Sequence, residues 1–497
     1  MRILQINNYA DPVGGAEIYA LALARELTER GHMVVFFGTS PDREEDAESL
    51  RVVRRPRYDV RFLFNDPLVR DALEATVTRS RPELLHVHNV FSLGVDVLEF
   101  LGTTGIPIVQ TVHDFGLLCP NSWCVWGDGS PCPGGAGAKC FLHDCQRNYP
   151  YDPEVALHTL LKQRTLAGIV DLAICPSRYL AERMRANGSS DVRHLNYFVD
   201  PIAAGAAGER DSKELVFIGR LEPEKGVEHL LEAMPHILRV DPSVHLTVIG
   251  GGTLADPLAA RARSLGLGSS ATFQSHVPRA ELGRVYATAT ACVLPSIWSE
   301  NSPLVAYECL AAGLPMIASR IGGIPELVEE GLGGFTFTPR DPRDLAEKAL
   351  RLLDLPPGER ARMSVAMRAA AEGFRIEAHL DRIEGLYDEV RSRPRSTFGA
   401  RSTIDRDLLA VLAEYGSEKG RLGALFLEHT GYIRHLEQTL AARPPAASAE
   451  EHRRLIRELE ASLAQHRARL DALESGGPKQ ILRRLARALH ISKVLRG

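Results

Sequence analysis

The sequence lacks any run of about 18–20 apolar residues, the length that a membrane-spanning helix needs, although 44% of its 497 residues are hydrophobic. Its formal net charge is only −4, so no excess of positive charge points to a nucleic-acid partner. The opening MRILQINNYA has neither the apolar core nor the small-residue cleavage site of a signal peptide. We therefore expect a cytoplasmic protein that binds no nucleic acid. Its length predicts more than one domain.

Two informative motifs are missing as well. The first predicted strand is followed by the doublet Gly14-Gly15 and not by the G-x-G-x-x-G fingerprint of dinucleotide-binding proteins. The one D-x-D sequence, at residues 405–407, lies in the C-terminal tail, away from the segments where we expect chemistry. We therefore expect no nicotinamide or flavin cofactor and no catalytic metal ion held by carboxylates.

Short apolar runs, bounded by turn residues, alternate with helical periodicity through most of the chain. The pattern begins with RILQINN, GG and AEIYALALARELTERG, and it restarts with ELVFIGRL after the Pro-, Gly- and Ala-rich stretch at 198–212. Buried parallel strands have near-continuous apolar sequences, so the alternation predicts a doubly wound α/β fold. We expect two Rossmann-like domains, at residues 1–198 and 199–375, that face a ligand-binding cleft.

The tail at 396–497 differs in composition from both domains. Residues 448–475 are rich in Glu, Arg, Ala and Leu, which predicts a helix or a short coiled coil. Residues 479–496 carry basic but no acidic side chains, and their apolar residues share one helical face. This basic amphipathic pattern favours binding to an anionic membrane surface. Packing on the chain itself, or on a dimer partner through the tail helices, is the alternative.

The segment WSENSPLVAYECLAAG at 298–313 contains a predicted helix start. Asn301 or Ser302 is expected to cap the helix, and Pro303 suits its first position because proline lacks the N–H that would be unsatisfied there. The amides of Leu304 and Val305 then remain free. Free amides at a helix N-terminus favour a phosphate group.

Two glutamates flank this helix start. Glu300 comes directly before the predicted helix, where it can accept hydrogen bonds from sugar hydroxyls, and Glu308 lies inside the helix, within reach of a ribose. Paired glutamates are common on protein surfaces, but the apolar flanks make a solvated face a poor explanation here. We therefore assign both to ligand binding.

Two cations, Arg220 and Lys225, follow the strand that ends at Gly219, just before the next predicted helix. Side chains of this kind can hold a diphosphate and stabilise its negative charge as it departs. The alternative is a surface ion pair with Glu222 or Glu224. In the N-terminal half, His113 ends the strand PIVQTV, and Gly14-Gly15 allows close approach of the backbone to a ligand.

Together these features resemble the retaining glycosyltransferases of family 4, the glycosyl transferases of group 1, which have the GT-B fold. The resemblance covers about residues 1–390 and is most specific over 214–340, where the pair Glu300/Glu308 is followed by GLPMIASRIGGIPELV. Such enzymes transfer a sugar from a nucleotide-sugar to an acceptor hydroxyl and retain the configuration of the anomeric carbon. Arg220 and Lys225 would clamp the donor diphosphate. Glu300 would contact the donor sugar and Glu308 the ribose of the nucleotide.

The resemblance also implies roles for the N-terminal half. His113 would lie in the cleft near the anomeric carbon, and the Gly14-Gly15 loop would close over the donor phosphates and admit the acceptor. Residues 376–395 would form a crossover helix that packs back on the N-terminal domain. The family gives no strong expectation for the cysteine-rich insertion at 119–145 or for the tail.

Five of the eight cysteines lie within the insertion, at spacings x4, x7, x7 and x4. Cytosolic thiols stay reduced, which favours a metal over disulfides, and structural zinc takes four N or S ligands. We predict a structural zinc ion with Cys124 or His143 as substitute ligands and this main set: Cys119, Cys132, Cys140 and Cys145. An iron–sulfur cluster, disulfides and free thiols are the alternatives. We expect the insertion to hold a loop at the rim of the acceptor domain.

The basic tail suggests a lipid-linked or cell-surface glycan as the acceptor, and a protein on the cytoplasmic face of a membrane. Two other functions are compatible with the architecture. A sugar-nucleotide 2-epimerase shares the two domains but lacks an acceptor site, and a non-catalytic nucleotide-sugar-binding scaffold would use the tail as its working part.

Overall fold

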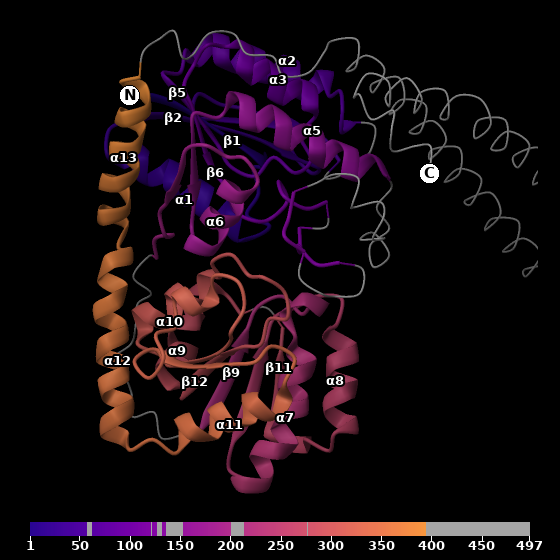
Figure 1. Ribbon diagram of the computed structural model, residues 1–497, viewed down its shortest axis with the longest axis vertical. Helices are drawn as coiled ribbons and strands as arrows, with labels where there is room; N and C mark the ends of the chain where they lie inside the picture. Colours follow the sequence, from indigo (N-terminus) through magenta and orange to yellow (C-terminus); the bar gives the residue numbers. More distant parts are fainter. Residues whose placement is uncertain are drawn as a thin grey trace, which may run out of the picture.

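The structure is a computed structural model that describes residues 1–56, 62–120, 122–126, 132–135, 153–199, 213–275 and 277–393. These residues form two α/β units stacked one above the other (Figure 1). Two long helices, α12 (Pro357–Ala371) and α13 (Ile376–Arg391), run along one side of both units. The predicted α/β fold of two Rossmann-like domains is confirmed.

The N-terminal unit is built on an eight-stranded sheet in the order β3-β4-β2-β1-β5-β6-β7-β8, in which only the short β3 runs antiparallel to its neighbour. Three central strands are buried along their whole length, which explains their near-continuous apolar sequences. The strands are β1 (Arg2–Tyr9), β2 (Met33–Ser40), β3 (Glu45–Asp46), β4 (Leu50–Arg54), β5 (Leu84–Val87), β6 (Ile108–Thr111), β7 (Leu172–Cys175) and β8 (Val192–His194).

Helices flank this sheet, and local sequence fixes where two of them begin. Asp66 accepts a hydrogen bond from the amide of Val69 and is followed by a proline, and Ser177 accepts one from the amide of Leu180. Asp66 therefore caps α2 (Pro67–Ser80), and Ser177 caps α6 (Arg178–Ala186). The helices are α1 (Gly15–Glu29), α2 (Pro67–Ser80), α3 (Val95–Thr103), α5 (Pro153–Ile169) and α6 (Arg178–Ala186).

The C-terminal unit has a six-stranded parallel sheet in the order β11-β10-β9-β12-β13-β14. Its strands are β9 (Glu214–Ile218), β10 (His245–Ile249), β11 (Ala271–Gln274), β12 (Ala291–Leu294), β13 (Met316–Ser319) and β14 (Gly334–Phe337). Its α-helices are α7 (Val227–Val240), α8 (Ala255–Ser264), α9 (Arg279–Thr288), α10 (Leu304–Ala312) and α11 (Pro342–Leu353). Short 3-10 turns are η2 (Pro223–Lys225), η3 (Gly268–Ser270), η4 (Ile324–Glu326) and η5 (Glu372–Phe374).

The chain crosses back from the C-terminal unit to the N-terminal one between α12 and α13 (Figure 1). The first of these helices packs on α10. On the second, His379 Nε2 lies 2.8 Å from Tyr19 Oη of α1, and Tyr387 Oη lies 2.7 Å from His86 Nδ1 of β5. All four side chains are buried, so polar contacts as well as apolar packing hold α13 on the N-terminal unit.

One hydrophobic cluster continues from one unit into the other. It includes Tyr19 and Leu195 of the N-terminal unit, Tyr307 of α10, Met367 of α12 and Tyr387 of α13. A shared core of this kind holds the two units in one relative orientation. The cleft between them is thereby given a defined shape.

Among the described residues, no helix is both long enough and apolar enough to cross a membrane. The predicted basic amphipathic helix at 479–496, and the tail as a whole, lie outside the described residues. So do Cys140, His143 and Cys145 of the insertion.

The contact between α13 and the N-terminal unit gives a stability prediction. Tyr387→Phe removes the hydroxyl that His86 Nδ1 meets and leaves a buried ring nitrogen without that partner, which should lower the free energy of unfolding by about 1–3 kcal/mol. Urea unfolding followed by circular dichroism measures this change. Unchanged stability would show that the hydrogen bond does not help to dock α13.

Candidate active site

A cavity of about 660 Å³ lies between the two units. Its walls are formed by the β1–α1 loop, the end of β6, the loop after β9 and the start of α10, so the carboxyl ends of parallel strands from both sheets face it. Each residue predicted from the sequence for catalysis or donor binding lines this cavity: Gly14, Gly15, His113, Arg220, Lys225, Glu300, Asn301, Ser302, Leu304, Val305 and Glu308.

A partly buried ion pair lies on the C-terminal wall. Lys225 Nζ lies 2.5 Å from Glu300 Oε1, and Ser296 Oγ donates a hydrogen bond of 2.8 Å to the same oxygen. Glu300 is only 7% exposed. Burial opposes its ionisation, but the charge and hydrogen bond of Lys225, together with hydrogen bonds from Ser296 and Trp298, outweigh burial and lower the pKa of Glu300 below its ordinary value. The carboxylate therefore stays ionised near neutral pH and can accept hydrogen bonds from a ligand in the cavity.

The second predicted cation is placed differently. Arg220 Nη2 donates a hydrogen bond of 2.8 Å to Glu224, which is the ion pair considered as the alternative from the sequence. The Arg220 side chain is nevertheless 62% exposed and lines the cavity, so its guanidinium remains open to an anion. Glu308, one helical turn into α10, accepts a hydrogen bond of 2.6 Å from Tyr286 Oη.

The start of α10 differs from the sequence-based expectation. The helix begins at Leu304, with Pro303 at the N-cap position and no side-chain hydrogen bond that caps it. Asn301 does not cap because its side chain binds the other unit, and Ser302 does not cap because its hydroxyl binds both Tyr307 of α10 and the other unit. The amides at the start of α10 keep their capacity to bind a negative group from the cavity.

The expected caps instead join the two units. Asn301 Nδ2 donates to the His113 carbonyl at 2.8 Å, while Ser177 Oγ donates to Asn301 Oδ1 at 2.6 Å. Ser302 Oγ donates to the Pro176 carbonyl at 3.2 Å. All three contacts bring the start of α10 against the carboxyl ends of N-terminal strands.

The ring of His113 is neutral, and each of its nitrogens lies within hydrogen-bond distance of a partner. Its Nδ1 lies 2.6 Å from Tyr197 Oη, and its Nε2 lies 3.2 Å from His88 Nδ1. Burial lowers the pKa of His113 to about 3, so the imidazole carries no charge near neutral pH. His113 lines the cavity as a fixed neutral group, and this geometry does not favour a role as a proton shuttle.

The β1–α1 loop meets α10 across the cavity. A Cβ on Gly15 would lie 3.3 Å from Leu304 Cδ1, so only glycine permits this approach without a shift of that side chain. Gly14 is the N-cap of α1 in an extended conformation open to any residue.

Two carboxylic acids lie on the N-terminal wall, and only one of them, Glu17, was not singled out from the sequence. Glu17 is buried in the first turn of α1 and Asp114 lies directly after His113, and both line the cavity. Burial raises the pKa of each, and the negative charge of Asp114 raises that of Glu17 further. The position of Glu17, three residues after the N-cap, was the signal available in the sequence.

The comparisons with known proteins agree with this geometry. Residues 13–202 match the family described as Glycosyltransferase Family 4, and residues 204–370 match Glycosyl transferases group 1. A curated relative, the glycogen synthase of Mycobacterium tuberculosis, is 38% identical over 417 residues, which cover 75% of this chain and 91% of the relative. The chain belongs to the group 1 glycosyltransferases.

Other similar proteins extend this result. The D-inositol 3-phosphate glycosyltransferase of Thermobifida fusca is 28% identical to this glycosyltransferase, over 78% of this chain and 91% of the relative. Among solved structures, the sucrose-phosphate synthase of Thermosynechococcus elongatus aligns with a TM-score of 0.62 at 23% identity and covers 78% of this chain and 98% of its own. The Anabaena protein Alr3699/HepE, in complex with UDP-glucose, aligns at 0.56 and 18% identity, over 78% and 100% of the two chains. Both structures share the fold.

The glycosyltransferase has three described cysteines in its insertion, and all are buried: Cys119, Cys124 and Cys132. None of the described cysteines is in a disulfide. The thiols of Cys119 and Cys124 lie in hydrogen-bond contact, and this contact raises the pKa of Cys124, with burial adding to it. Within the described residues, no group of three or more Cys, His, Asp or Glu side chains is arranged to hold a metal ion. The zinc site stays a prediction because two of its ligands lie outside these residues.

The zinc prediction is tested by metal analysis. Protein purified without chelator should contain about one zinc per chain by elemental mass spectrometry, since four thiolates form a closed structural site. The double variant Cys140→Ser/Cys145→Ser should lose the metal, while Cys292→Ser, in β12 of the other unit, should keep it. Metal-free wild-type protein in which all eight thiols titrate would rule out the zinc site.

Proposed function

We propose that this glycosyltransferase transfers a sugar from a nucleoside diphosphate sugar to an acceptor hydroxyl with retention at the anomeric carbon. The observation that carries the proposal is the C-terminal wall of the cavity, where Lys225, Arg220 and the uncapped start of α10 lie beside the ionised Glu300. Cations and helix amides suit a diphosphate, and a buried carboxylate suits sugar hydroxyls. Similar solved structures hold UDP or UDP-glucose, which supports a donor of this class.

The proposed reaction breaks the bond between the anomeric carbon and the diphosphate oxygen, and the electron pair leaves with the diphosphate. The acceptor oxygen bonds to the anomeric carbon from the same face, and its proton passes to the departing phosphate oxygen. Lys225 and the α10 amides would stabilise the charge on that oxygen, where positive groups are worth most. Glu300 is held by Lys225 and Ser296, so we assign it to binding the donor sugar and not to attack on the anomeric carbon.

Assay of a panel of nucleotide-sugars tests the donor and the role of Glu300. Wild-type enzyme should release nucleoside diphosphate from one class of donor, and nuclear magnetic resonance of the product should show the anomeric configuration of the donor. Glu300→Gln removes the charge but keeps the shape, and should lower transfer by about a hundredfold or more at an unchanged melting temperature.

The matched control is Glu222→Gln, in the same part of the C-terminal unit, where the carboxylate binds Thr253 and does not line the cavity. Its transfer rate should stay close to that of the wild type. Near-normal transfer by Glu300→Gln would contradict the assignment. Conversion of the nucleotide-sugar to its 2-epimer without an acceptor would indicate an epimerase instead.

The acceptor side favours a neutral, hydroxyl-rich molecule such as the end of a glycan. Among the described residues that line the cavity from the N-terminal unit, the ionisable side chains are Glu17, Asp114, Tyr197 and the neutral His113, and none is a cation. Carboxylates accept hydrogen bonds from hydroxyls, whereas they repel a phosphate. This supports the proposal of a glycan acceptor. Attachment of the acceptor to a lipid, membrane binding through 479–496 and dimerisation through the tail rest on residues beyond the described ones.

Matched acceptor pairs test this charge preference. With the donor found above, glucose should be a better acceptor than glucose 6-phosphate, and inositol better than inositol 3-phosphate. Asp114→Asn should narrow the difference within a pair because it removes one repelling charge from the wall. Faster transfer to the phosphorylated member of a pair would contradict the preference.

A further inference from the structure

Two of the three tryptophans of the chain meet at a junction between the cysteine-rich insertion and the C-terminal wall of the cavity, here called the donor wall. Trp123 and Trp126 belong to the short described stretch 122–126, and Trp298 follows β12 and lines the cavity. The rings of Trp123 and Trp298 meet edge to face, with centroids 6.4 Å apart and planes at 64°. This is a favourable geometry for an aromatic pair. The insertion therefore contacts the C-terminal unit at its donor side.

Trp298 in turn lies beside the ion pair of Lys225 and Glu300. Lys225 Nζ is 5.9 Å from the centroid of the Trp298 ring, and the same ammonium group binds Glu300. The ring thus limits where Lys225 can lie. A change in the position of Trp298 would change the position of the two charges proposed to hold the donor.

The backbone at Trp123 is held in an unusual conformation. Its neighbours Ser122 and Cys124 both have positive φ, at 58° and 51°, in the left-handed region that residues other than glycine rarely adopt. Strained backbone persists only where surrounding contacts impose it, and it is frequent at functional sites. Two such residues on either side of one side chain fix its direction.

Hydrogen bonds within the insertion, and one from α6, hold this conformation. The amide of Ser122 donates to the Cys119 carbonyl at 3.0 Å, and the amide of Cys132 donates to the Cys124 carbonyl at 2.7 Å. Arg183 of α6 donates a hydrogen bond to the Cys132 carbonyl. The insertion is therefore fastened to α6.

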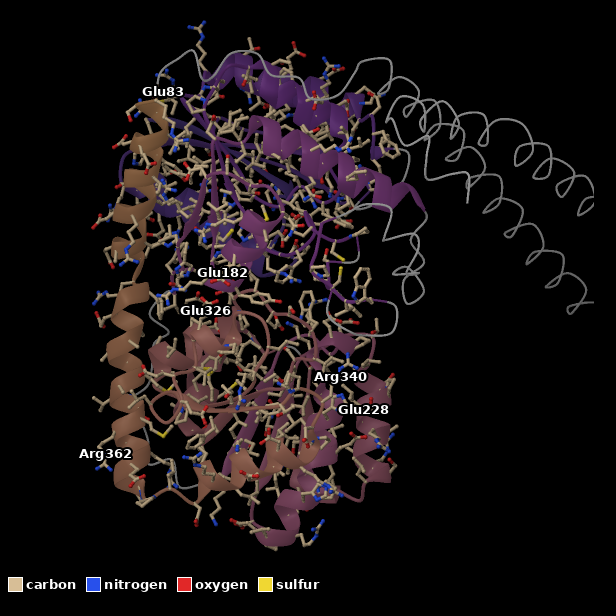
Figure 2. The ribbon with its side chains drawn as sticks, viewed as in Figure 1. Glu83, Glu182, Glu228, Glu326, Arg340 and Arg362 are labelled. Carbon is tan, nitrogen blue, oxygen red and sulfur yellow. The ribbon has the colours of Figure 1, made fainter. Side chains whose placement is uncertain are left out.

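The helix α6 is itself joined to the C-terminal unit. Glu326 accepts hydrogen bonds from the amides of Arg178 and Tyr179, at 2.8 and 2.7 Å, and so caps α6 from the other unit. Figure 2 shows Glu326 at the boundary between the units, close to Glu182 of α6. The insertion that carries Trp123 is thus bound to α6, and α6 is bound to the C-terminal unit.

We propose that Trp123 is a positioning residue of the donor site: it holds Trp298 against Lys225, and through Lys225 it sets the position of Glu300. This inference rests on the proposed donor class. It assigns the described part of the insertion to donor binding, whereas the sequence suggested a loop at the acceptor rim. A purely structural role for Trp123 would affect stability without changing donor affinity.

The test compares Trp123→Leu, which keeps apolar bulk but loses the ring, with Trp123→Phe, which keeps an aromatic edge. Trp123→Leu should raise the KM for the nucleotide-sugar by about three- to tenfold with kcat much less changed, the effect expected for the loss of one aromatic contact. Trp123→Phe should restore most of the affinity. Trp126→Phe, in the same stretch, is the matched control, and the melting temperature of each variant is measured in parallel.

Fluorescence gives a readout that needs no turnover. In the variant Trp123→Phe/Trp126→Phe the tryptophan emission comes from Trp298 alone, and titration with UDP should change this emission. The variant Trp123→Leu/Trp126→Phe should bind UDP with a higher Kd. Equal donor KM and equal Kd in the Leu and Phe variants would overturn the inference while leaving the proposed function intact. Wild-type protein that neither binds nor turns over any nucleotide-sugar would overturn both.

Discussion

The ionised carboxylate of Glu300 is the constraint around which the rest of the donor wall is arranged. A carboxylate that is almost removed from water is costly unless a positive partner and hydrogen bonds compensate, and Lys225 and Ser296 supply both. Lys225 follows β9 and Glu300 follows β12. The two side chains can meet only if both strands end at the same edge of the sheet, and the direct parallel pairing of β9 and β12 ensures this. The doubly wound topology thus places two charges side by side that are 75 residues apart in the chain.

The donor wall carries charged side chains, whereas the histidines packed behind the opposite, N-terminal wall of the cavity are neutral. His86, His88 and His113 are packed together with Tyr19 and Tyr197, and burial lowers the pKa of all three histidines. The cluster therefore contributes hydrogen bonds without net charge near neutral pH, and it leaves Glu17 and Asp114 as the carboxyl groups of that wall. This difference fits the proposed function, in which the cavity takes a diphosphate on one side and hydroxyl groups on the other.

Local pattern was sufficient to predict the fold and to select residues that line the C-terminal wall of the cavity. Short apolar strands, a helix start after Glu300 and two cations after Gly219 are each recognisable from a few consecutive residues. The partners of those residues are not, because they are set by packing between distant segments. Asn301 illustrates this: its sequence context is that of a cap, but Ser177 and the His113 carbonyl, 124 and 188 residues away, take its side chain instead. Glu17 and Trp123 were missed for the same reason, since their significance lies in what they face.

The same contacts explain why the start of α10 has no side-chain cap. A cap from Asn301 or Ser302 would satisfy the first amides of the helix and leave less capacity for a phosphate. Because both side chains bind the N-terminal unit, the helix start remains available to a ligand, and the units are held together at the same point. The closed cleft and the free start of α10, the proposed phosphate site, are therefore consequences of one set of hydrogen bonds. A change that opened the cleft would release Asn301 and Ser302 to cap α10, and would weaken the site for the donor at the same time.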